Sequence, residues 1–518
     1  MDAPPPTLPA QSATIEPADA DALPAFSHQQ IVQVLTGILL CILLAAIDQT
    51  VVVPAVPAIA ADLNGFGHLS WIVSAYLLTS TSSAPVYGKL SDIYGRRALL
   101  LPAIVVFVIA SILCALSQSL FQLIVFRALQ GLGGGGLMAM AQAAIADVVA
   151  PRERGKYQGY MAGTWGVASI FGPILGGWMT DYLSWHWIFW INVPIGIAAF
   201  FLSSRALKLL KVRRTTARVD YLGAALLTGF ITTCLLMMSW GGVEYSWVSP
   251  EITGMGGLAL ALLAALIWQE RRYIDPLLPP RLFTNSVFSL GVMIAFLATA
   301  GMLGGTFLLP LFFQLIGGVD ASASGTMIVP FLGFNVVGAY VSGQLARRLG
   351  RAKGIVLGGL AASCVGFLLL ATATGHTPGP VLVLYMAVVG LGIGLCMPSS
   401  LVIVQNAAER RDVGAATGAL LFLRSMGGAF GSTLAGALLT GHFTQRLAEL
   451  GVTQSIDLGA LRGAEGATLV LDEATRTLAR TALSGGFHLT FLVCAGLSAI
   501  AVLACLFMRD LPLQSGAK

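Results

Sequence analysis

The stretch Gly88-Lys-Leu-Ser-Asp-Ile-Tyr-Gly-Arg-Arg97 decides the fold, because it is a short basic connection between two long apolar runs. The runs on either side, residues 69–88 and 98–116, are each long enough to cross a bilayer as a helix, which takes about 20 residues. Runs of this kind recur along all 518 residues, of which 56% are hydrophobic and 10% charged. Because soluble domains carry about 25% charged residues, the composition excludes an ordinary soluble protein and predicts an all-α integral membrane protein.

The apolar runs predict fourteen transmembrane helices and a division of the chain into two bundles. The expected spans are residues 33–57, 69–88, 98–116, 121–148, 155–180, 187–208, 219–240, 251–269, 287–314, 322–345, 354–374, 379–405, 413–440 and 486–508. The expected units are a disordered cytoplasmic tail (1–32), an N-terminal six-helix bundle (33–210), two inserted transmembrane helices with linkers (211–285), a C-terminal six-helix bundle (286–508) and a cytoplasmic tail (509–518). Residues 441–485 are expected to form an amphipathic helical excursion over the outer face.

The placement of the 29 Lys and Arg residues predicts the orientation of these spans. With the N-terminus inside, most of them fall on inward connections, as the positive-inside rule requires. We therefore expect a multi-pass protein of the cell inner (plasma) membrane with both termini in the cytoplasm. Topology also explains the net charge of +5, so the lipid bilayer is an expected partner and nucleic acid is not.

A variant of the first stretch recurs in the second half of the chain, as Gly343-Gln-Leu-Ala-Arg-Arg-Leu-Gly-Arg351, at an offset of 255 (343 minus 88). Likewise, Gly131-Leu-Gly133 has a near match in Gly390-Leu-Gly392. Parallel repeats about an axis along the membrane normal build many secondary transporters, whose site lies at the midplane between the halves. The repeat therefore predicts two equivalent bundles around a central site.

The stretch 88–97 resembles the G-x-L-A-D-R-x-G-R-R signature of the major facilitator superfamily. The residues that match this signature are Gly88, Asp92, Gly95, Arg96 and Arg97. Ser91 and Ile93 depart from it, and the second change removes one charge of the loop. The resemblance implies a gating loop that locks one conformation through contacts between the halves; the alternative is a loop that only orients the chain.

Two further motifs lie in the fourth and fifth spans. Arg127-Ala-Leu-Gln130-Gly-Leu-Gly133 is similar to the R-x-x-Q-G-x-G motif of the same family, and Arg127 and Gln130 share one helix face. Residues 159–177 resemble the G-x8-G-x3-G-P-x2-G motif associated with antiporters, with Ala168 at its second glycine. The matching residues are Gly159, Gly172, Pro173 and Gly176. A proline flanked by glycines bends a helix and lets a neighbour approach closely.

The first span contains Ala46-Ile-Asp48-Gln-Thr50, followed by Pro54 and Pro57. It resembles the L-D-x-T-I-V-N-V-A-L-P motif of fourteen-span drug:proton antiporters of the EmrB/QacA type. Asp48 is the only acid deep in a predicted span, and the span directions place it and Arg127 at the same depth, roughly 12 Å from the outer face. Burial disfavours a charged carboxyl group and a nearby arginine favours it. Asp48 and Arg127 are therefore the candidates for proton coupling, with a static ion pair as the alternative.

These features predict a proton-coupled multidrug efflux antiporter that exports amphipathic compounds by alternating access. Lipophilic cations are the favoured substrates because Asp48 is a strong anion, whereas Arg424 in the thirteenth span favours anions. The candidate residues of the substrate cavity are Tyr76, Gln130, Met138, Gln142, Trp165, Gln314, Asn335, Tyr385 and Arg424.

Other classes of protein are disfavoured by what the sequence lacks. It has no H-E-x-x-H, no G-x-S-x-G and no phosphate-binding P-loop. We therefore expect no enzyme, no metal site and no cofactor, with proton motive force as the driver. The expected partners are protons and a small-molecule substrate, and the expected state is a monomer. The alternative function is export of a specific metabolite, lipid or siderophore, with a periplasmic adaptor as a further partner.

Overall fold

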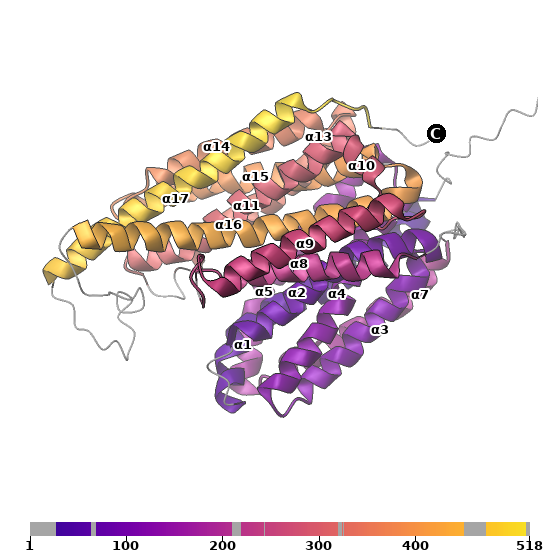
Figure 1. Cartoon of the computed structure of the whole chain (residues 1–518), viewed down its shortest axis with the longest axis horizontal. Coiled ribbons are helices and arrows are strands. Elements are labelled where there is room, and N and C mark those ends of the chain that lie inside the picture. The colour runs from indigo at the N-terminus through magenta and orange to yellow at the C-terminus, as the bar shows by residue number, and fades with distance from the viewer. Residues whose placement is uncertain are drawn as a thin grey trace, which may run out of the picture.

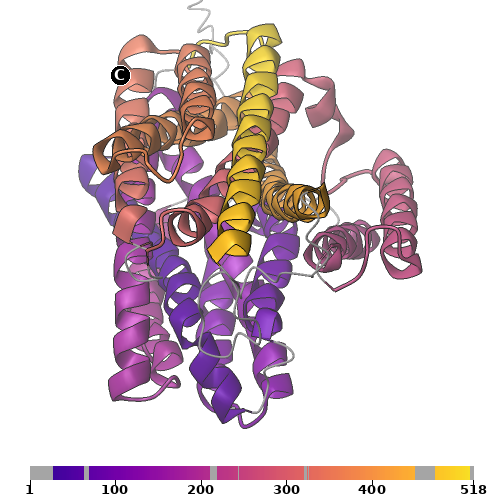
Figure 2. The ribbon, with the colours of Figure 1, turned by 90° about the vertical axis from the view of Figure 1, so that its left-hand side faces the viewer.

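The computed structural model describes residues 27–63, 69–209, 219–242, 244–319, 324, 326–449 and 473–513. Over these residues the chain is helical and has no sheet, since extended pairing there is limited to two isolated β-bridges. The helices form two bundles that lie side by side, with a pair of helices at their flank (Figure 1 and Figure 2).

The N-terminal bundle runs from α1 to α7, the flanking pair is α8 and α9, and the C-terminal bundle runs from α11 to α17. The first bundle consists of α1 (His28–Asp62), α2 (Leu69–Tyr94), α3 (Arg96–Ala115), α4 (Leu120–Val148), α5 (Pro151–Tyr182), α6 (Trp187–Trp190) and α7 (Asn192–Ala206). The flank consists of α8 (Tyr221–Trp240) and α9 (Pro250–Arg272), followed by the short α10 (Pro280–Thr284). The second bundle consists of α11 (Ser286–Leu315), α13 (Val329–Leu349), α14 (Lys353–Ala371), α15 (Gly379–Ala407), α16 (Val413–Glu449) and α17 (Glu473–Phe507).

Among the described residues, twelve helical segments are long and apolar enough to cross a membrane. The predicted count of fourteen is therefore not supported by length and composition. The two helices that fall short are α2 and α5, which have 26 and 32 residues. Their composition is the reason: α2 contains an unbroken run of hydroxyl side chains at 79–83, and α5 is rich in glycine between 159 and 177.

The two bundles are built alike, as the internal repeat predicts. In the N-terminal bundle α4 packs against α2 and α3, and α1 packs against α5. In the C-terminal bundle α15 packs in the same way against α13 and α14, and α11 against α16. The halves meet through two symmetric pairs, α2 with α16 and α5 with α13, and α8 lies against both α2 and α16.

Helix α1 begins earlier than the sequence predicts. Residues 28–32 were expected in the disordered tail, but the Ser27 side chain accepts a hydrogen bond from the Gln30 backbone N–H, and the Gln30 side chain accepts one from the Ser27 backbone N–H. This capping box supplies partners for N–H groups that a helix start leaves unpaired. The rest of the predicted tail, residues 1–26, lies outside the described residues.

The predicted excursion at 441–485 is not a separate pair of amphipathic helices where the structure describes it. Its first stretch continues α16 without a break to Glu449, and its second belongs to α17, which starts at Glu473. Phe443 on α16 packs in one buried cluster with Leu483 on α17, so the apolar stripes of both stretches bury each other. Residues 450–472 lie outside the described part of the chain.

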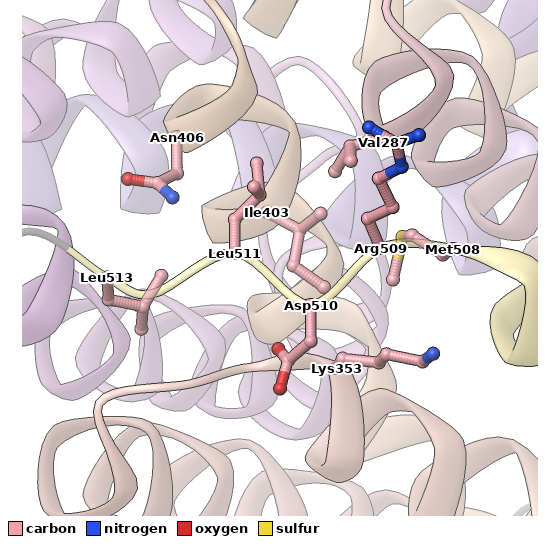
Figure 3. A pocket seen from close by; sticks show the side chains of 9 residues that line it. All are labelled: Val287, Lys353, Ile403, Asn406, Met508, Arg509, Asp510, Leu511 and Leu513. Atoms are coloured by element: carbon pink, nitrogen blue, oxygen red, sulfur yellow. The ribbon is translucent and has the colours of Figure 1, made fainter.

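The segment that follows α17, residues 508–513, is hydrogen-bonded and ion-paired to the C-terminal bundle. The Leu513 backbone N–H donates to the Gly350 carbonyl at 2.9 Å, and Arg351 forms an ion pair with Asp510 at 3.2 Å. Figure 3 shows this segment crossing beside Lys353 and Asn406. The cavity lined there holds only about 10 Å³, room for about one water molecule, so it is no candidate for a substrate site.

Candidate functional site

A buried polar cluster lies inside the N-terminal bundle, centred on Asp48 of α1. The Arg127 guanidinium on α4 approaches the Asp48 carboxylate at 2.6 Å. The Gln130 amide donates to the other carboxylate oxygen at 2.8 Å, and its carbonyl accepts from Arg127 at 2.8 Å. Asp48 is 0% exposed and Arg127 1% exposed. The equal depth read from the sequence thus corresponds to a direct ion pair.

Asn192 completes this cluster and was not singled out as a site residue from the sequence. Its amide donates to Asp48 at 2.8 Å and to the Ser111 hydroxyl at 2.9 Å. It sits at the start of α7, where the chain resumes a helix after the short α6. An amide within an apolar run was the available signal, because a polar side chain inside a membrane span needs a partner.

Aromatic rings enclose the cluster on the side of Arg127. The Arg127 guanidinium carbon lies 4.6 Å from the centre of the Tyr76 ring and 5.8 Å from that of Phe189. Its Nε also donates to the Ile72 carbonyl at 3.1 Å. In this conformation every polar atom of the Asp48 carboxylate is bound by protein, and the pair is sealed from solvent.

The loop at residues 88–97, which was predicted to be a gate, contacts the C-terminal half. Asp92, near the end of α2, accepts hydrogen bonds from the backbone N–H groups of Gly414 and Ala415, both at 3.0 Å. These groups belong to the first turn of α16, where the helix dipole favours a negative charge. Gly88 packs so closely on Gly414 that an added Cβ would overlap the Gly414 carbonyl oxygen. The predicted contact between the halves is therefore present.

The arginines of this loop lie on the N-terminal side of the contact. Arg96 pairs with Asp92 at 2.7 Å and with Asp147 at the end of α4, also at 2.7 Å. Gly95 has a φ of 88°, which lets α2 and α3 join through a single residue. Arg97 follows within α3. The face formed by this loop, by the start of α5 with Arg152 and by the end of α13 with Arg347 and the following Arg351 is called the basic face below.

Two more contacts between the halves close the basic face. The Arg152 side chain of α5 donates to the Arg347 carbonyl of α13 at 2.8 Å. Gly155 and Gly343 bring the same helices so close that an added Cβ at Gly155 would lie 2.8 Å from the Gly343 Cα. At the opposite face of the molecule the two bundles spread apart (Figure 1).

The glycine motif of α5 serves two different neighbours. Gly159 faces Tyr340 of α13, where an added Cβ would lie 3.1 Å from the Tyr340 Cα. Gly172 and Gly176 instead lie against α1, where a Cβ would overlap Thr50 and the Val51 carbonyl oxygen. Pro173 lies inside the helix between the last two glycines. The first part of α5 thus contacts the other half, and the last part belongs to its own bundle.

The predicted cavity residues are not gathered in one place. Tyr76 and Gln130 belong to the buried cluster, and Met138 and Trp165 pack against the core of the N-terminal bundle. The Gln142 backbone carbonyl accepts from the Gln405 side chain of α15 at 3.4 Å, which is a further contact between the halves.

The candidates in the C-terminal bundle are likewise spread out. Gln314 donates to Ser324 at 2.8 Å, and Tyr385 packs against the bundle core. Asn335 lies on α13, where α15 packs against it. Arg424 lies on α16, where its NH2 group donates to the Met397 carbonyl and to the Ser400 hydroxyl of α15.

A cavity of about 580 Å³ lies where both halves meet the inserted helix α8. Its walls are apolar and hydroxyl side chains from α2, α8, α11 and α16, among them Leu77, Thr81, Met238, Leu303 and Ser432. This volume is in the range of small-molecule sites. None of the predicted cavity residues lines it.

The chain belongs to the major facilitator superfamily, whose family model, described as "Major Facilitator Superfamily", matches residues 38–432. It is 37% identical to the multidrug transporter protein MdtP of Bacillus subtilis over 78% of this chain and 74% of that protein. It is 36% identical to an uncharacterised MFS-type transporter of Mycobacterium tuberculosis over 93% of this chain and 70% of that protein. The protein is accordingly a multi-pass membrane transporter with multidrug and efflux homologues, and not an enzyme.

Solved structures agree with the fold. The human organic anion transporter MFSD10 superimposes with a TM-score of 0.61 at 17% identity, covering 92% of this chain and 99% of that one. The proton:xylose symporter XylE superimposes with a TM-score of 0.60 at 15% identity, covering 94% and 97%. At these identities the likeness concerns the arrangement of the helices alone.

Proposed function

We propose that the protein is a proton-coupled efflux antiporter that exports amphipathic small molecules by alternating access, with proton motive force and no cofactor as its driver. The observation that carries this proposal is the buried Asp48–Arg127 pair, whose carboxylate is otherwise held by the neutral amides of Gln130 and Asn192. An ionisable group inside a membrane span is functional by default, because its burial is expensive.

The proposed coupling step is the binding of one proton to Asp48. Protonation neutralises the carboxylate and removes the counter-charge of Arg127, so the guanidinium must find other partners or become hydrated. The surrounding groups of Ser111, Gln130 and Asn192 can donate or accept hydrogen bonds with either form of the carboxyl. Release of the proton restores the pair seen here.

The contacts on the basic face supply the second element, a gate. Three contacts hold this face shut: Asp92 of α2 accepts from the first turn of α16, Gly155 packs against Gly343, and Gln405 donates to the Gln142 backbone carbonyl. Because such contacts join the halves at one side only, rocking of the bundles would break them and open that side. In this proposal the protein is closed toward the cytoplasm and open toward the outside.

The orientation and span count form part of the same proposal. In this proposal the protein lies in the inner membrane, and the positive-inside rule orients the basic face toward the cytoplasm. Both termini are then cytoplasmic. α2 and α5 pack within their bundle as α13 and α16 do within theirs, so we count them as spans. Twelve apolar helices and these two give fourteen, the arrangement of the EmrB/QacA type.

The class of cargo remains a prediction at this point. Lipophilic cations would be the expected substrates if the Asp48 carboxylate were free to bind them. In this conformation, however, protein groups bind both of its oxygens. Export of a specific metabolite, lipid or siderophore is the alternative, with a periplasmic adaptor at the open side. Apolar walls with scattered hydroxyl groups, as in the cavity of about 580 Å³, suit the apolar body of either kind of cargo.

The test follows the transport of three probes, as efflux from energised cells or as uptake into energised inside-out vesicles: cationic ethidium, neutral N-phenyl-1-naphthylamine and anionic 1-anilinonaphthalene-8-sulfonate. We expect protonophore-sensitive efflux of at least one probe, reduced about tenfold or more by Asp48→Asn and retained in part by Asp48→Glu. The matched control is Asp181→Asn, which removes an exposed carboxylate at the end of α5. Undiminished, proton-driven efflux in Asp48→Asn would contradict the coupling role, and efflux of no probe would contradict the transport proposal.

A further inference from the structure

Arg424 is a cation without a counter-charge inside a spanning helix. It lies 11 residues from the start of α16, about 16 Å along the helix axis at 1.5 Å per residue. Its NH2 group donates to the Met397 carbonyl and, at 2.8 Å, to the Ser400 hydroxyl, both neutral acceptors. Its Nε is buried and has no hydrogen-bond partner. In the part of the chain that the structure describes, no carboxylate forms an ion pair with it.

The charges of the membrane interior therefore do not balance. Asp48 and Arg127 cancel within the N-terminal bundle, and the remaining oxygen of Asp48 is occupied by Gln130 and Asn192. Arg424 adds one positive charge that nothing described in the C-terminal bundle offsets. A buried charge persists in proteins when it is paired or when a ligand pairs it.

The position of Arg424 suits a ligand that enters from the open side. Gln405 of α15 donates to the Thr417 hydroxyl of α16 at 3.1 Å and to the Gln142 carbonyl at 3.4 Å, which closes the path toward the basic face. Arg424 lies two helical turns beyond Thr417, about 10 Å farther from that face. Its side chain is partly exposed and points toward α15, on a different face of α16 from Ser425, which lines the cavity of about 580 Å³.

We propose that Arg424 binds the anionic group, a carboxylate or sulfonate, of the amphipathic cargo. The inference rests on the proposed transport function and names its substrate class: the guanidinium pairs with the anion beside α15, and the apolar body extends toward the open side. A planar guanidinium with a free N–H matches a carboxylate or sulfonate well. Exported molecules are then anionic amphiphiles, the reverse of the class that Asp48 alone suggests.

The test compares two probes that share one aromatic body. 1-Anilinonaphthalene-8-sulfonate carries a sulfonate and N-phenyl-1-naphthylamine lacks it, so their difference reports on the charge alone. Binding is measured by equilibrium dialysis of the full chain in lipid nanodiscs, for wild type, Arg424→Gln and Arg424→Lys. The control variant is Arg348→Gln, which removes an exposed arginine at the end of α13.

We expect Arg424→Gln to weaken binding of the sulfonate about tenfold or more, as loss of a charge-assisted hydrogen bond predicts, and to change binding of the neutral probe less than threefold. Arg424→Lys keeps the charge and should keep the preference for the sulfonate. Equal losses for both probes, or a preference that survives in Arg424→Gln, would overturn the inference. If the sulfonate binds through Arg424 but no probe is moved by a proton gradient, the proposed transport function fails instead.

Discussion

In the N-terminal half, Arg127 lies against Asp48 at 2.6 Å and is enclosed by Tyr76 and Phe189, whereas in the C-terminal half Arg424 meets only a carbonyl and a hydroxyl. The two arginines do not occupy equivalent positions in the repeat, because Arg127 lies on α4, the counterpart of α15, and Arg424 lies on α16, the counterpart of α5. The repeat preserves glycines, as in Gly131-Leu-Gly133 and Gly390-Leu-Gly392, but not these charges. A paired charge can respond to protons, and an unpaired one can respond to an anion.

The largest effect is expected from breaking the pair in the N-terminal half. Arg127→Leu leaves Asp48 buried and unpaired, which costs about 3–5 kcal/mol when one partner of a buried pair is removed. We expect a large loss of folded protein in the membrane, measured by thermal melting and size-exclusion chromatography. The double variant Asp48→Asn with Arg127→Leu should regain most of that stability without regaining proton coupling. If Arg127→Leu alone were as stable as the double variant, Arg127 would not be needed to balance a buried Asp48, and the contrast with the unpaired Arg424 would fail.

A smaller effect is expected where the halves meet. Gly155→Val places a side chain against the Gly343 backbone, and overpacking of this kind costs about 1–3 kcal/mol. In the proposed alternating access this contact is lost when the basic face opens, so the cost should shift the protein toward the opposite conformation. Spin labels on Glu153 and Arg348 would then report a longer distance across that face. Gly163→Val, on the same helix with open space around it, is the control and should leave the distance unchanged.

The smallest effect tests whether the C-terminal half can be made to resemble the N-terminal one. Ser400→Asp gives Arg424 an internal counter-charge at the position of a hydroxyl that it already contacts. We expect binding of the sulfonate probe to fall about tenfold, or ~1.4 kcal/mol, with the fold intact. Ser400→Asn, similar in shape and neutral, should retain the binding. Equal behaviour of the two variants would contradict an anion site at Arg424.

Much of the fold could be predicted because it depends on local patterns. Apolar runs bounded by charged loops give the helices, and the recurrence of a glycine-rich basic loop gives the two halves. The number of spans was harder to predict, because hydroxyl groups in α2 and glycines in α5 lower the hydropathy of these helices while packing keeps both of them in the bundles. The continuation of α16 and α17 past the predicted spans was missed, because their amphipathic ends look like independent surface helices.

The site was predictable only as far as depth along a helix allows. Counting residues along two antiparallel spans was enough to place Asp48 beside Arg127. It could not place Asn192, whose amide reaches Asp48 because the short α6 redirects the chain before α7 begins. Nor could it place the cavity residues, since Tyr76 turns inward over a guanidinium and Arg424 turns toward α15. Side-chain direction depends on neighbouring helices, which sequence spacing does not describe.

The length of α16 has a practical consequence for watching this protein move. Its 37 residues extend about 55 Å, against a hydrocarbon thickness of about 30 Å, so its far end stands well outside the bilayer. The helix is anchored near the basic face by Asp92 and packed against α17 near its tip. It is therefore a rigid lever: if the C-terminal half rotates about the middle of the helix, about 28 Å from the tip, the tip travels about 0.5 Å for each degree. A fluorophore near Glu449 would amplify a rotation that is almost invisible at the pivot.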